Sequence, residues 1–377
     1  MTRNKEIDPG GLDEYSVVFT NRSVNHMSAQ FCLAMRDISA GLKTTYGGDA
    51  VALVPGGGTF GMESVARLFA GGEHCLVLQN GWFSYRWRQI LETGKIAAKL
   101  AVCLATTVNH GDNQTYRPAA IQDIVDKIKK DRPAVVFAPH VETSSGVLLP
   151  ADYIAALTEV VHAHGGIFVL DCIASGAQWV DMEALGVDVL ITAPQKGWSS
   201  TPCAAAVVLS RHALSIAENR ESSSYSCDLK KWLSIMRTYE EGGHAYHTTM
   251  PTDALIQFRN AIMETRSIGL THLADAQKNL GTQVRGLLES AGYPSVAADG
   301  FKSNSVVVSY TDKPEIKNGS LFAKAGMQIA AGVPLMCGEP TDFSTFRIGL
   351  FGLDKLNNVE KTVQRLEKAI MAIDAMK

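Results

Sequence analysis

Three consecutive glycines in the first sixth of the chain could bind an anion. Gly56, Gly57 and Gly58 follow a short apolar run and are followed by Thr59, where a helical pattern begins. Glycines let backbone N–H groups approach a ligand, and the dipole of a helix N-terminus favours negative charge. Thr59 adds a hydroxyl donor. The segment matches neither the dinucleotide-binding nor the P-loop pattern, so a plain tight turn is the alternative interpretation.

A carboxylate stands where a buried strand is expected to end. Asp171 directly follows the apolar run 167–170. Open α/β sheets bind their ligands at the carboxyl ends of their strands. An unpaired buried charge is costly, so a carboxylate at this place needs a partner. The alternative is an Asp that caps a following helix.

A lysine follows the next apolar run along the chain. Lys196 comes a few residues after the run 187–191 and is flanked by turn-forming residues. A lysine taken out of water has a lowered pKa and becomes an amine nucleophile, suited to Schiff-base chemistry. Considered alone, it could equally be an ordinary surface lysine in a loop.

These three features together are more specific than any one of them. An anion-binding loop, then Asp171, then Lys196 25 residues later is the arrangement that pyridoxal phosphate requires. The loop anchors the phosphate, Asp171 keeps the pyridine nitrogen protonated, and Lys196 forms a Schiff base with the cofactor. The sequence therefore predicts a pyridoxal-phosphate enzyme.

The elements that must position these residues alternate along the first two-thirds of the chain. Runs typical of strands occupy 50–54, 75–78, 134–138, 167–170, 187–191 and 204–209. Amphipathic helical patterns occupy 121–130 and 153–164. This alternation predicts an α/β fold, with a mostly parallel sheet covered by helices on both faces.

The pattern changes after about residue 250. Two long helices are expected at 254–267 and 272–291, strands at 305–310 and 345–350, and a terminal helix at 359–376. This predicts a smaller α+β domain. The expected organisation is an N-terminal arm over 1–23, a large cofactor-binding domain over 24–270 and a small C-terminal domain over 271–377.

Composition excludes several classes of protein. The 377 residues are 46% hydrophobic and 19% charged, which excludes a disordered chain. A net charge of −3 gives no reason to expect a nucleic acid or an anionic membrane as partner. The seven cysteines form no C-x-x-C pair, so neither a disulfide framework nor a metal site is expected. No signal peptide and no bilayer-length apolar run is present, which predicts a cytoplasmic protein.

Six motifs extend the argument from chemistry to a family. In chain order they are PGGGTFGMES, NGWFSYR, HVETSSGVLLP, LDCIASGAQWVDMEALGVDVLITAPQKGWSSTP, HAYHTTMP and FRIGLFG. Over about residues 24–375 the chain resembles the class V aminotransferases, pyridoxal-phosphate enzymes of fold type I, and most closely the alanine–glyoxylate and serine–glyoxylate branch. The resemblance implies ping-pong transfer of an amino group, through the Lys196 Schiff base, from a small α-amino acid such as alanine or serine to glyoxylate or pyruvate.

The resemblance also implies roles for residues around the cofactor. Lys196 aligns with the Schiff-base lysine and Gln195 with a neighbour that helps to hold the phosphate. Asp171 aligns with the partner of the pyridine nitrogen, and Ile173 with an apolar residue on the ring face. Thr143 aligns with a hydroxyl residue near the phenolic oxygen. Gly57, Gly58 and Thr59 align with the phosphate loop of the family.

Further roles concern stacking, the substrate and a second subunit. Phe83 falls where the family has an aromatic residue that stacks on the ring, and Trp82 beside it is the alternative. Arg347 aligns with the arginine that pairs with the substrate carboxylate. Tyr246 and Thr249 align with residues that reach the cofactor phosphate of the partner subunit, which implies a homodimer with shared sites.

The sequence leaves other functions open. The N-terminal segments 8–16 and 25–28 depart from the family pattern that shapes the substrate pocket, so the specificity of relatives does not transfer. A 2-aminoethylphosphonate-type transaminase and a pyridoxal-phosphate lyase or cysteine desulfurase of the same fold are the alternatives, and Cys337 is the only plausible thiol for the latter. A non-catalytic protein that retains the fold is a further alternative. His140 and His247 are additional candidates for acid–base work.

Overall fold

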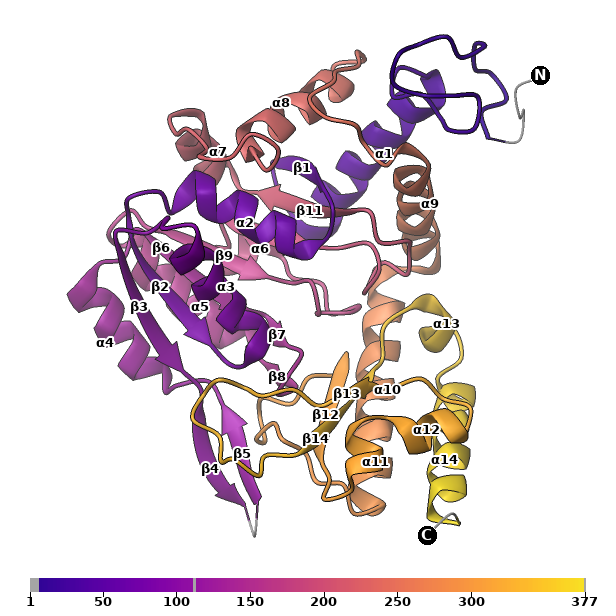
Figure 1. Ribbon diagram of the computed structural model, residues 1–377. Helices are drawn as coiled ribbons and strands as arrows, with labels where there is room; N and C mark the ends of the chain where they lie inside the picture. The colour runs from indigo at the N-terminus through magenta and orange to yellow at the C-terminus, as the bar shows by residue number, and fades with distance from the viewer. Residues whose placement is uncertain (1–6, 111–112, 376–377) are drawn as a thin grey trace.

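A computed structural model describes residues 7–110 and 113–375, and its centre is a seven-stranded mixed sheet (Figure 1). In spatial order the strands are β1 (Ala50–Pro55), β11 (Ala204–Leu209), β10 (Val189–Thr192), β9 (Ile167–Asp171), β6 (Val135–Pro139), β2 (His74–Gln79) and β3 (Lys99–Leu104). β11 runs antiparallel to both of its neighbours, and the other pairings in this sheet are parallel. The mostly parallel sheet is confirmed, with β3 as a strand that the sequence pattern did not reveal.

Helices cover both faces of this sheet, which explains its continuous apolar strands. α2 (Gly58–Phe69) and α3 (Trp82–Thr93) pack side by side on one face, against β11, β2 and β6. α4 (Ile121–Asp131) and α5 (Ala151–His162) pack together on the other face, with α5 against β9. Right-handed crossovers place these two pairs on opposite faces, because the chain moves along the sheet in opposite directions in the two cases.

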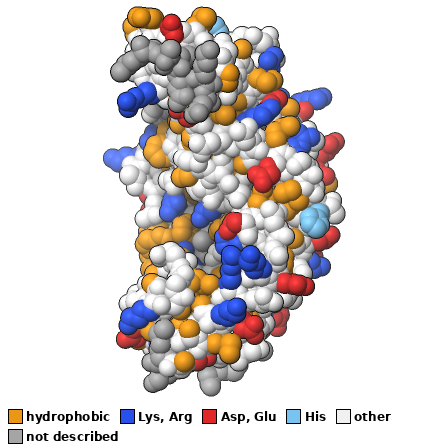
Figure 2. Space-filling view, turned by 90° about the vertical axis from the view of Figure 1, so that its right-hand side faces the viewer, with side chains coloured by type: hydrophobic (Ala, Val, Ile, Leu, Met, Phe, Trp, Pro, Cys, Tyr) orange, Lys and Arg blue, Asp and Glu red, His pale blue; other side chains and the backbone are white. Residues whose placement is uncertain are grey.

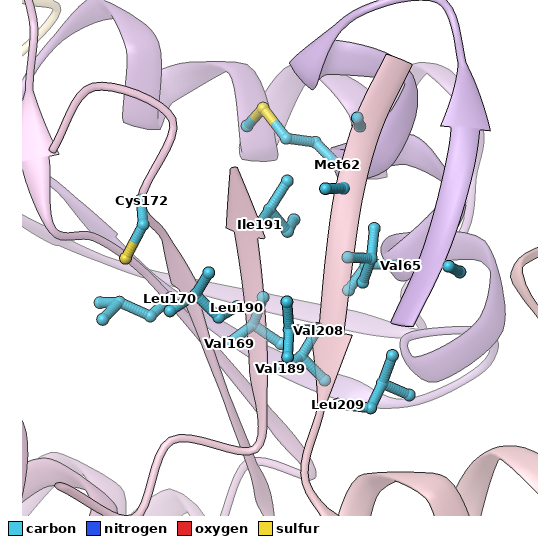
Figure 3. Packing of buried hydrophobic residues seen from close by; sticks show 14 of the residues in the cluster. Met62, Val65, Val169, Leu170, Cys172, Val189, Leu190, Ile191, Val208 and Leu209 are labelled. Atoms are coloured by element: carbon cyan, nitrogen blue, oxygen red, sulfur yellow. The ribbon is translucent and has the colours of Figure 1, made fainter. Parts of the chain in front are cut away.

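The contact between α2 and the sheet is close (Figure 3). Met62 and Val65 of α2 are buried, and the view shows Met62 near Ile191 of β10. On the same helix, a Cβ added to Gly61 would lie 2.5 Å from the Cβ of Ala205. The glycine therefore lets α2 sit against β11, which fixes the place of its N-terminus relative to the strand ends.

The remaining helices of this part of the chain surround the β1 edge. They are α1 (Ala29–Tyr46), α6 (Met182–Leu185), α7 (Arg211–Glu218), α8 (Leu229–Glu240) and α9 (Thr252–Ile268). The Ser28 side chain caps α1 by accepting a hydrogen bond from Phe31 N. α1 packs against α8 and α9, and α8 packs against β1.

The C-terminal part contains a second, antiparallel sheet of β12 (Val306–Tyr310), β14 (Thr345–Gly349) and β13 (Ala330–Ala331). Its helices are α10 (Leu270–Ser290), α11 (Pro314–Lys317), α12 (Ser320–Lys324), α13 (Leu353–Leu356) and α14 (Val359–Asp374). The expected long helices, strands and terminal helix are all present, although the predicted end of the last helix, residue 376, lies outside the described residues. These elements have their own apolar cluster, which includes Leu280, Phe322 and Phe346. The division at residue 270 stays a prediction.

Two small hairpins complete the described structure. β4 (Thr106–His110) pairs with β5 (Asn113–Arg117), and β7 (Val141–Glu142) pairs with β8 (Val147–Leu148). Charged side chains of both signs are spread over the face seen in Figure 2, with a group of Lys and Arg near its middle beside a hollow. Within the described residues, the search for a helix of sufficient length and hydropathy to cross a bilayer finds no candidate.

Candidate functional site

A cavity of about 160 Å³ lies at the carboxyl edge of the main sheet. Segments that follow β1, β2, β6, β9 and β10 meet there, as expected for the ligand-binding edge of an open sheet. The lining residues are Gly58, Thr59, Met62, Phe83, Arg86, Val141, Thr143, Asp171, Ile173, Ala174, Gln195 and Lys196. Most of the residues predicted to contact a cofactor are therefore gathered in one place.

The start of α2 forms one wall of this cavity. Gly57 is the N-cap residue, and no side chain accepts a hydrogen bond from the first turn of the helix. The first N–H groups of a helix have no partner within the helix, so those of Gly58 and Thr59 are available to an anion. A Cβ on Gly58 would overlap the side chain of Ile173. A larger residue at position 58 would therefore require the end of the Ile173 side chain to shift.

Asp171 is the last residue of β9 and is buried. Its Oδ1 accepts a hydrogen bond from Ile173 N at 2.9 Å, and no helix starts directly after it, so it does not act as a helix cap. Burial raises the pKa of Asp171 to about 7, and the nearby Glu142 adds to this effect. Lys196 and Arg86 oppose it. A cation beside Asp171 would therefore stabilise the ionised form of its carboxyl group.

Lys196 lies in the turn after β10 and is partly buried. Burial lowers the pKa of Lys196, Arg347 lowers it further, and Asp171 acts in the opposite direction. Its Nζ is 5.0 Å from the centroid of the Phe351 ring. A desolvated amine beside a carboxylate differs from a free surface lysine, and it is suited to proton transfer or to attack on a carbonyl.

The residues present fit pyridoxal phosphate in two further respects. Oε1 of Gln195 is buried without a hydrogen-bond partner among the described residues, so the amide beside the first turn of α2 has unused capacity. Phe83 and Ile173 supply apolar surface in the same cavity, whereas Trp82 is absent from its lining and its ring contacts Tyr85 at 5.9 Å. An anion site, a buried carboxyl and apolar walls together suit a phosphorylated aromatic ring.

Four predicted residues lie outside the lining. Gly57, the N-cap residue of α2, directly precedes Gly58, which is part of the lining. Arg347, on β14, donates from Nε to Ala331 O at 2.9 Å, and its guanidinium lies 5.5 Å from the Phe83 ring centroid, beside the cavity. Tyr246 is 50% exposed, and its hydroxyl lies 3.1 Å from Thr249 Oγ1. The structure therefore brings Arg347 to the rim of the site. It leaves Tyr246 and Thr249 on the surface, and their predicted role toward a partner subunit stays a prediction.

Arg86 is a lining residue that the sequence reading missed. Its Nη1 donates to Thr59 Oγ1 at 2.9 Å, and its guanidinium lies 5.2 Å from the Phe83 ring centroid. Phe83 and Arg86 are three residues apart on α3, a spacing that places both on one face of a helix. Helical spacing from Phe83 was therefore the signal that could have revealed this arginine.

The other candidate acids, bases and nucleophiles have ordinary surroundings. His140 is buried with Nδ1 2.7 Å from Ser175 Oγ, and burial lowers its pKa to about 4, so it is neutral. His247 Nε2 lies 2.8 Å from Tyr225 O. The thiol of Cys337 donates to Gln79 O at 3.4 Å, and burial raises its pKa to about 12. Such a cysteine is not the thiolate that sulfur-transfer chemistry needs.

Comparisons with known proteins agree with this chemistry. The family described as "Aminotransferase class-V" has a sequence model that matches residues 12–361. A 2-aminoethylphosphonate–pyruvate transaminase of Burkholderia lata is 26% identical, over 93% of this chain and 89% of that protein. An alanine–glyoxylate aminotransferase of Felis catus is 24% identical, over 92% and 82%. The crystal structure of ureidoglycine–glyoxylate aminotransferase from Bacillus subtilis has the same fold, with a TM-score of 0.78, 20% identity and coverage of 96% and 88%.

Proposed function

The chain belongs to the class-V aminotransferase family of pyridoxal-phosphate-dependent enzymes, and on that premise we propose that it transfers the amino group of a small α-amino acid, such as alanine or serine, to a 2-oxo acid such as glyoxylate or pyruvate. The observation that carries this proposal is the meeting of Asp171, Lys196 and the uncapped start of α2 in one cavity. Each of the three has an alternative explanation when it is considered alone, but binding of pyridoxal phosphate explains all three at once.

Pyridoxal phosphate would be held by residues of this cavity. The first-turn N–H groups of α2, the Thr59 hydroxyl and the Gln195 amide would hold its phosphate. Asp171 would pair with the ring nitrogen, and Phe83 and Ile173 would contact the two faces of the ring, with Thr143 near its phenolic oxygen. When bound, the cofactor supplies an electron sink for the charge that develops at the α-carbon of the amino donor.

The protein side chains would then move and hold protons. The Lys196 amine, with its lowered pKa, would remove the α-proton of the donor as a general base and return a proton on the same face. Asp171 would hold the proton on the ring nitrogen, because a cation beside the carboxylate stabilises its ionised form. Arg347, at the rim, would bind the substrate carboxylate through two parallel hydrogen bonds.

A second subunit is part of the proposal. Tyr246 and Thr249 are joined to each other on the surface of the single chain and do not line its cavity. In a two-fold dimer the same patch of each protomer would face the other. We therefore propose a homodimer in which Tyr246 and Thr249 complete the phosphate site of the partner subunit.

One observation favours a second candidate substrate. The guanidinium groups of Arg86 and Arg347 both lie within 5.5 Å of the Phe83 ring centroid, so two cations flank the cavity. An aminophosphonate donor carries more negative charge than a monocarboxylic amino acid, so the positive charge of both arginines would favour it. Transfer from 2-aminoethylphosphonate to pyruvate is accordingly the alternative function.

The test has two steps on the purified protein. Pyridoxal phosphate is first added to the apoprotein, and its absorbance spectrum is followed for the wild type, for Lys196→Ala and for the surface control Lys230→Ala. The wild type and the control are expected to show the same shifted absorbance band, which Lys196→Ala lacks. A Lys196→Ala protein that keeps the wild-type band would overturn the assignment.

The second step identifies the substrates. Alanine, serine and 2-aminoethylphosphonate are each added to the loaded wild type, with glyoxylate or pyruvate used for the return half-reaction. Spectral conversion by alanine or serine, with parallel initial-rate lines, supports the proposed function. Conversion by the phosphonate alone supports the alternative, and intersecting lines contradict ping-pong transfer.

A further inference from the structure

Glu142 is a fully buried carboxylate next to the site, and the chemistry described so far does not use it. It lies in β7, one residue before Thr143, with 0% of its surface exposed. Its Oε1 accepts hydrogen bonds from Phe83 N at 3.1 Å and from the N and Oγ of Ser144 at 3.0 and 2.7 Å. Its Oε2 accepts from the N and Oγ of Ser84 at 2.8 and 2.6 Å. All five donors belong to the start of α3 or to the turn of the β7–β8 hairpin.

These hydrogen bonds satisfy the backbone N–H groups at the N-terminus of α3. The first three helical residues are Trp82, Phe83 and Ser84, and their N–H groups have no partner within the helix. Trp82 N donates to Ser144 Oγ at 2.8 Å, and the next two donate to Glu142. A Cβ on Gly81, the N-cap residue, would overlap Ser144 Oγ. The carboxylate thus occupies the position that a bound anion takes at the start of a helix.

The N-terminus of the neighbouring helix, α2, differs from that of α3. α2 and α3 pack against each other, and both begin at the carboxyl edge of the sheet. Among the described residues α2 has no side-chain cap, whereas the N–H groups of Phe83 and Ser84 in the first turn of α3 donate to the Glu142 carboxylate. Of these two helix starts, the one at Gly58 is open to an external anion, and the one at Trp82 is already satisfied from within the protein.

α3 carries two of the residues that line the cavity. Phe83 is the second residue of α3 and donates its backbone N–H directly to Glu142, and Arg86 follows one turn later. Since Arg86 reaches Thr59 at the start of α2, the position of α3 sets the distance between the two helix starts. A shift of the first turn of α3 would move the aromatic ring and the guanidinium together.

We infer that Glu142 is a positioning residue of the cofactor site: its carboxylate anchors the first turn of α3, so that Phe83 and Arg86 meet the cofactor while the start of α2 alone receives the phosphate. This inference rests on the proposed function, because it concerns the same cavity and the same cofactor. It adds an internal carboxylate that acts on cofactor binding through the side chains it holds in place, besides its electrostatic effect on Asp171.

The chemistry requires a carboxylate at this position. Glu142 faces five donors, and an ionised carboxylate offers acceptors only. Glutamine at the same place would turn an NH₂ group toward N–H and O–H donors on one side, which leaves donors unsatisfied in a buried position. It would also remove the negative charge from the helix N-terminus. Glu142→Gln keeps nearly the same shape, and for these two reasons it should remove the anchoring function.

The experiment measures binding of pyridoxal phosphate to the apoprotein, not turnover. Wild type, Glu142→Gln, Ser144→Ala and the control Asp188→Asn are titrated with pyridoxal phosphate, and their thermal unfolding is recorded in parallel. Asp188 is a matched control because it is also a buried carboxylate and accepts from Phe168 N at 2.8 Å, away from the cavity. The expected result is a Kd at least tenfold higher for Glu142→Gln and at most twofold higher for Asp188→Asn, with similar losses in Tm.

Each outcome decides the inference. A Glu142→Gln protein that is folded and binds pyridoxal phosphate as tightly as the wild type overturns it. If Glu142→Gln does not fold, Ser144→Ala takes its place, since it removes the acceptor for Trp82 N and one donor to Glu142. A Kd raised threefold or more by Ser144→Ala supports the inference, and an unchanged Kd contradicts it. Failure of the wild type itself to bind the cofactor would instead overturn the proposed function.

Discussion

The guanidinium of Arg86 and the hydroxyl of Thr59 are joined across the cavity by a hydrogen bond of 2.9 Å from Nη1 to Oγ1. Arg86 belongs to the second turn of α3, and Thr59 to the first turn of α2. The bond therefore links two helices that start at the same edge of the sheet. It also places a permanent cation beside the backbone N–H groups at which the phosphate of the cofactor is expected.

Replacement of this cation should weaken binding in a phosphate-dependent way. A hydrogen bond to a charged group contributes about 1.5–3 kcal/mol, which corresponds to roughly 10–100-fold in affinity. We expect Arg86→Met to raise the Kd of the apoprotein for pyridoxal phosphate by at least tenfold. The affinity for pyridoxal, which has no phosphate, should change little. Both values can be measured by absorbance titration.

Arg67→Met is the control for this measurement. Arg67 is a cation on α2 itself, but it pairs with Glu63 at 2.7 Å on the surface of the helix. It should leave both affinities near the wild-type values, because Arg67 does not line the cavity. An equal loss of affinity for the two ligands in Arg86→Met would mean that the arginine acts on the ring or on the fold, not on the phosphate.

Asp171 should make the stability of the apoprotein depend on pH. Burial raises the pKa of Asp171 from 3.8 to about 7 in the folded protein, so between these values the folded state holds a proton that the unfolded state has released. The contribution of this group to stability is thus full below about pH 4 and is lost as pH rises through about 7. The maximum slope for one group is about 1.4 kcal/mol per pH unit.

The variant Asp171→Asn isolates this contribution. Asparagine does not titrate, so the free energy of unfolding of the variant, minus that of the wild-type apoprotein, should increase from pH 5 to pH 8. Urea unfolding at several pH values measures the difference, and other titrating groups cancel in it. Parallel pH profiles for the two proteins would show that Asp171 is ionised in the apoprotein throughout this range.

Much of the site could be predicted because its residues follow buried strands. Asp171 directly ends one apolar run, and Lys196 follows the next, so local sequence pattern already assigned both to the same edge of a sheet. The glycine loop was recognisable for a similar reason, since a helical pattern begins directly after it. Local periodicity carried this information, and the structure agrees with it.

The remainder of the site depends on contacts between distant segments. The bonds from Phe83 and Ser84 to Glu142 join residues 59 and 58 positions apart, and no local pattern encodes them. The motif around Glu142 was visible, but its carboxylate gains a role only when the β7–β8 hairpin packs against the start of α3. β3 was missed although residues 100–104 form an apolar run; it is an edge strand and is only partly buried.

Arg347 should control the affinity for the amino donor more than the rate of the chemical step. Its guanidinium is at the rim of the cavity, and its Nε donates to Ala331 O; within the described residues its terminal nitrogens make no hydrogen bond. We expect Arg347→Met to raise KM for a carboxylate donor by at least tenfold with a smaller change in kcat. Arg347→Lys should recover only part of this loss, because lysine cannot form the planar pair of bonds.

The control for the Arg347 variants is their affinity for the cofactor. Pyridoxal phosphate should bind to Arg347→Met with nearly wild-type affinity, since the arginine does not line the cavity. Half-reaction rates at increasing donor concentration give KM and kcat separately. A fall in kcat alone, with KM unchanged, would place Arg347 in the chemical step and not in substrate binding.

Sharing of the site between subunits can be tested by mixing two inactive variants. Lys196→Ala lacks the catalytic amine, and a protein with Tyr246→Phe and Thr249→Val lacks the hydroxyls expected to serve the partner's phosphate. If these hydroxyls act across a dimer, a mixed dimer contains one site with both features, because Lys196→Ala lends its Tyr246 and Thr249 to the other protomer. Equal mixing after dissociation and reassociation should then restore about a quarter of wild-type activity, since about half of the dimers are mixed and each has one complete site. If the hydroxyls act within their own chain, no mixed dimer has a complete site, and activity after mixing stays at the level of the two parents.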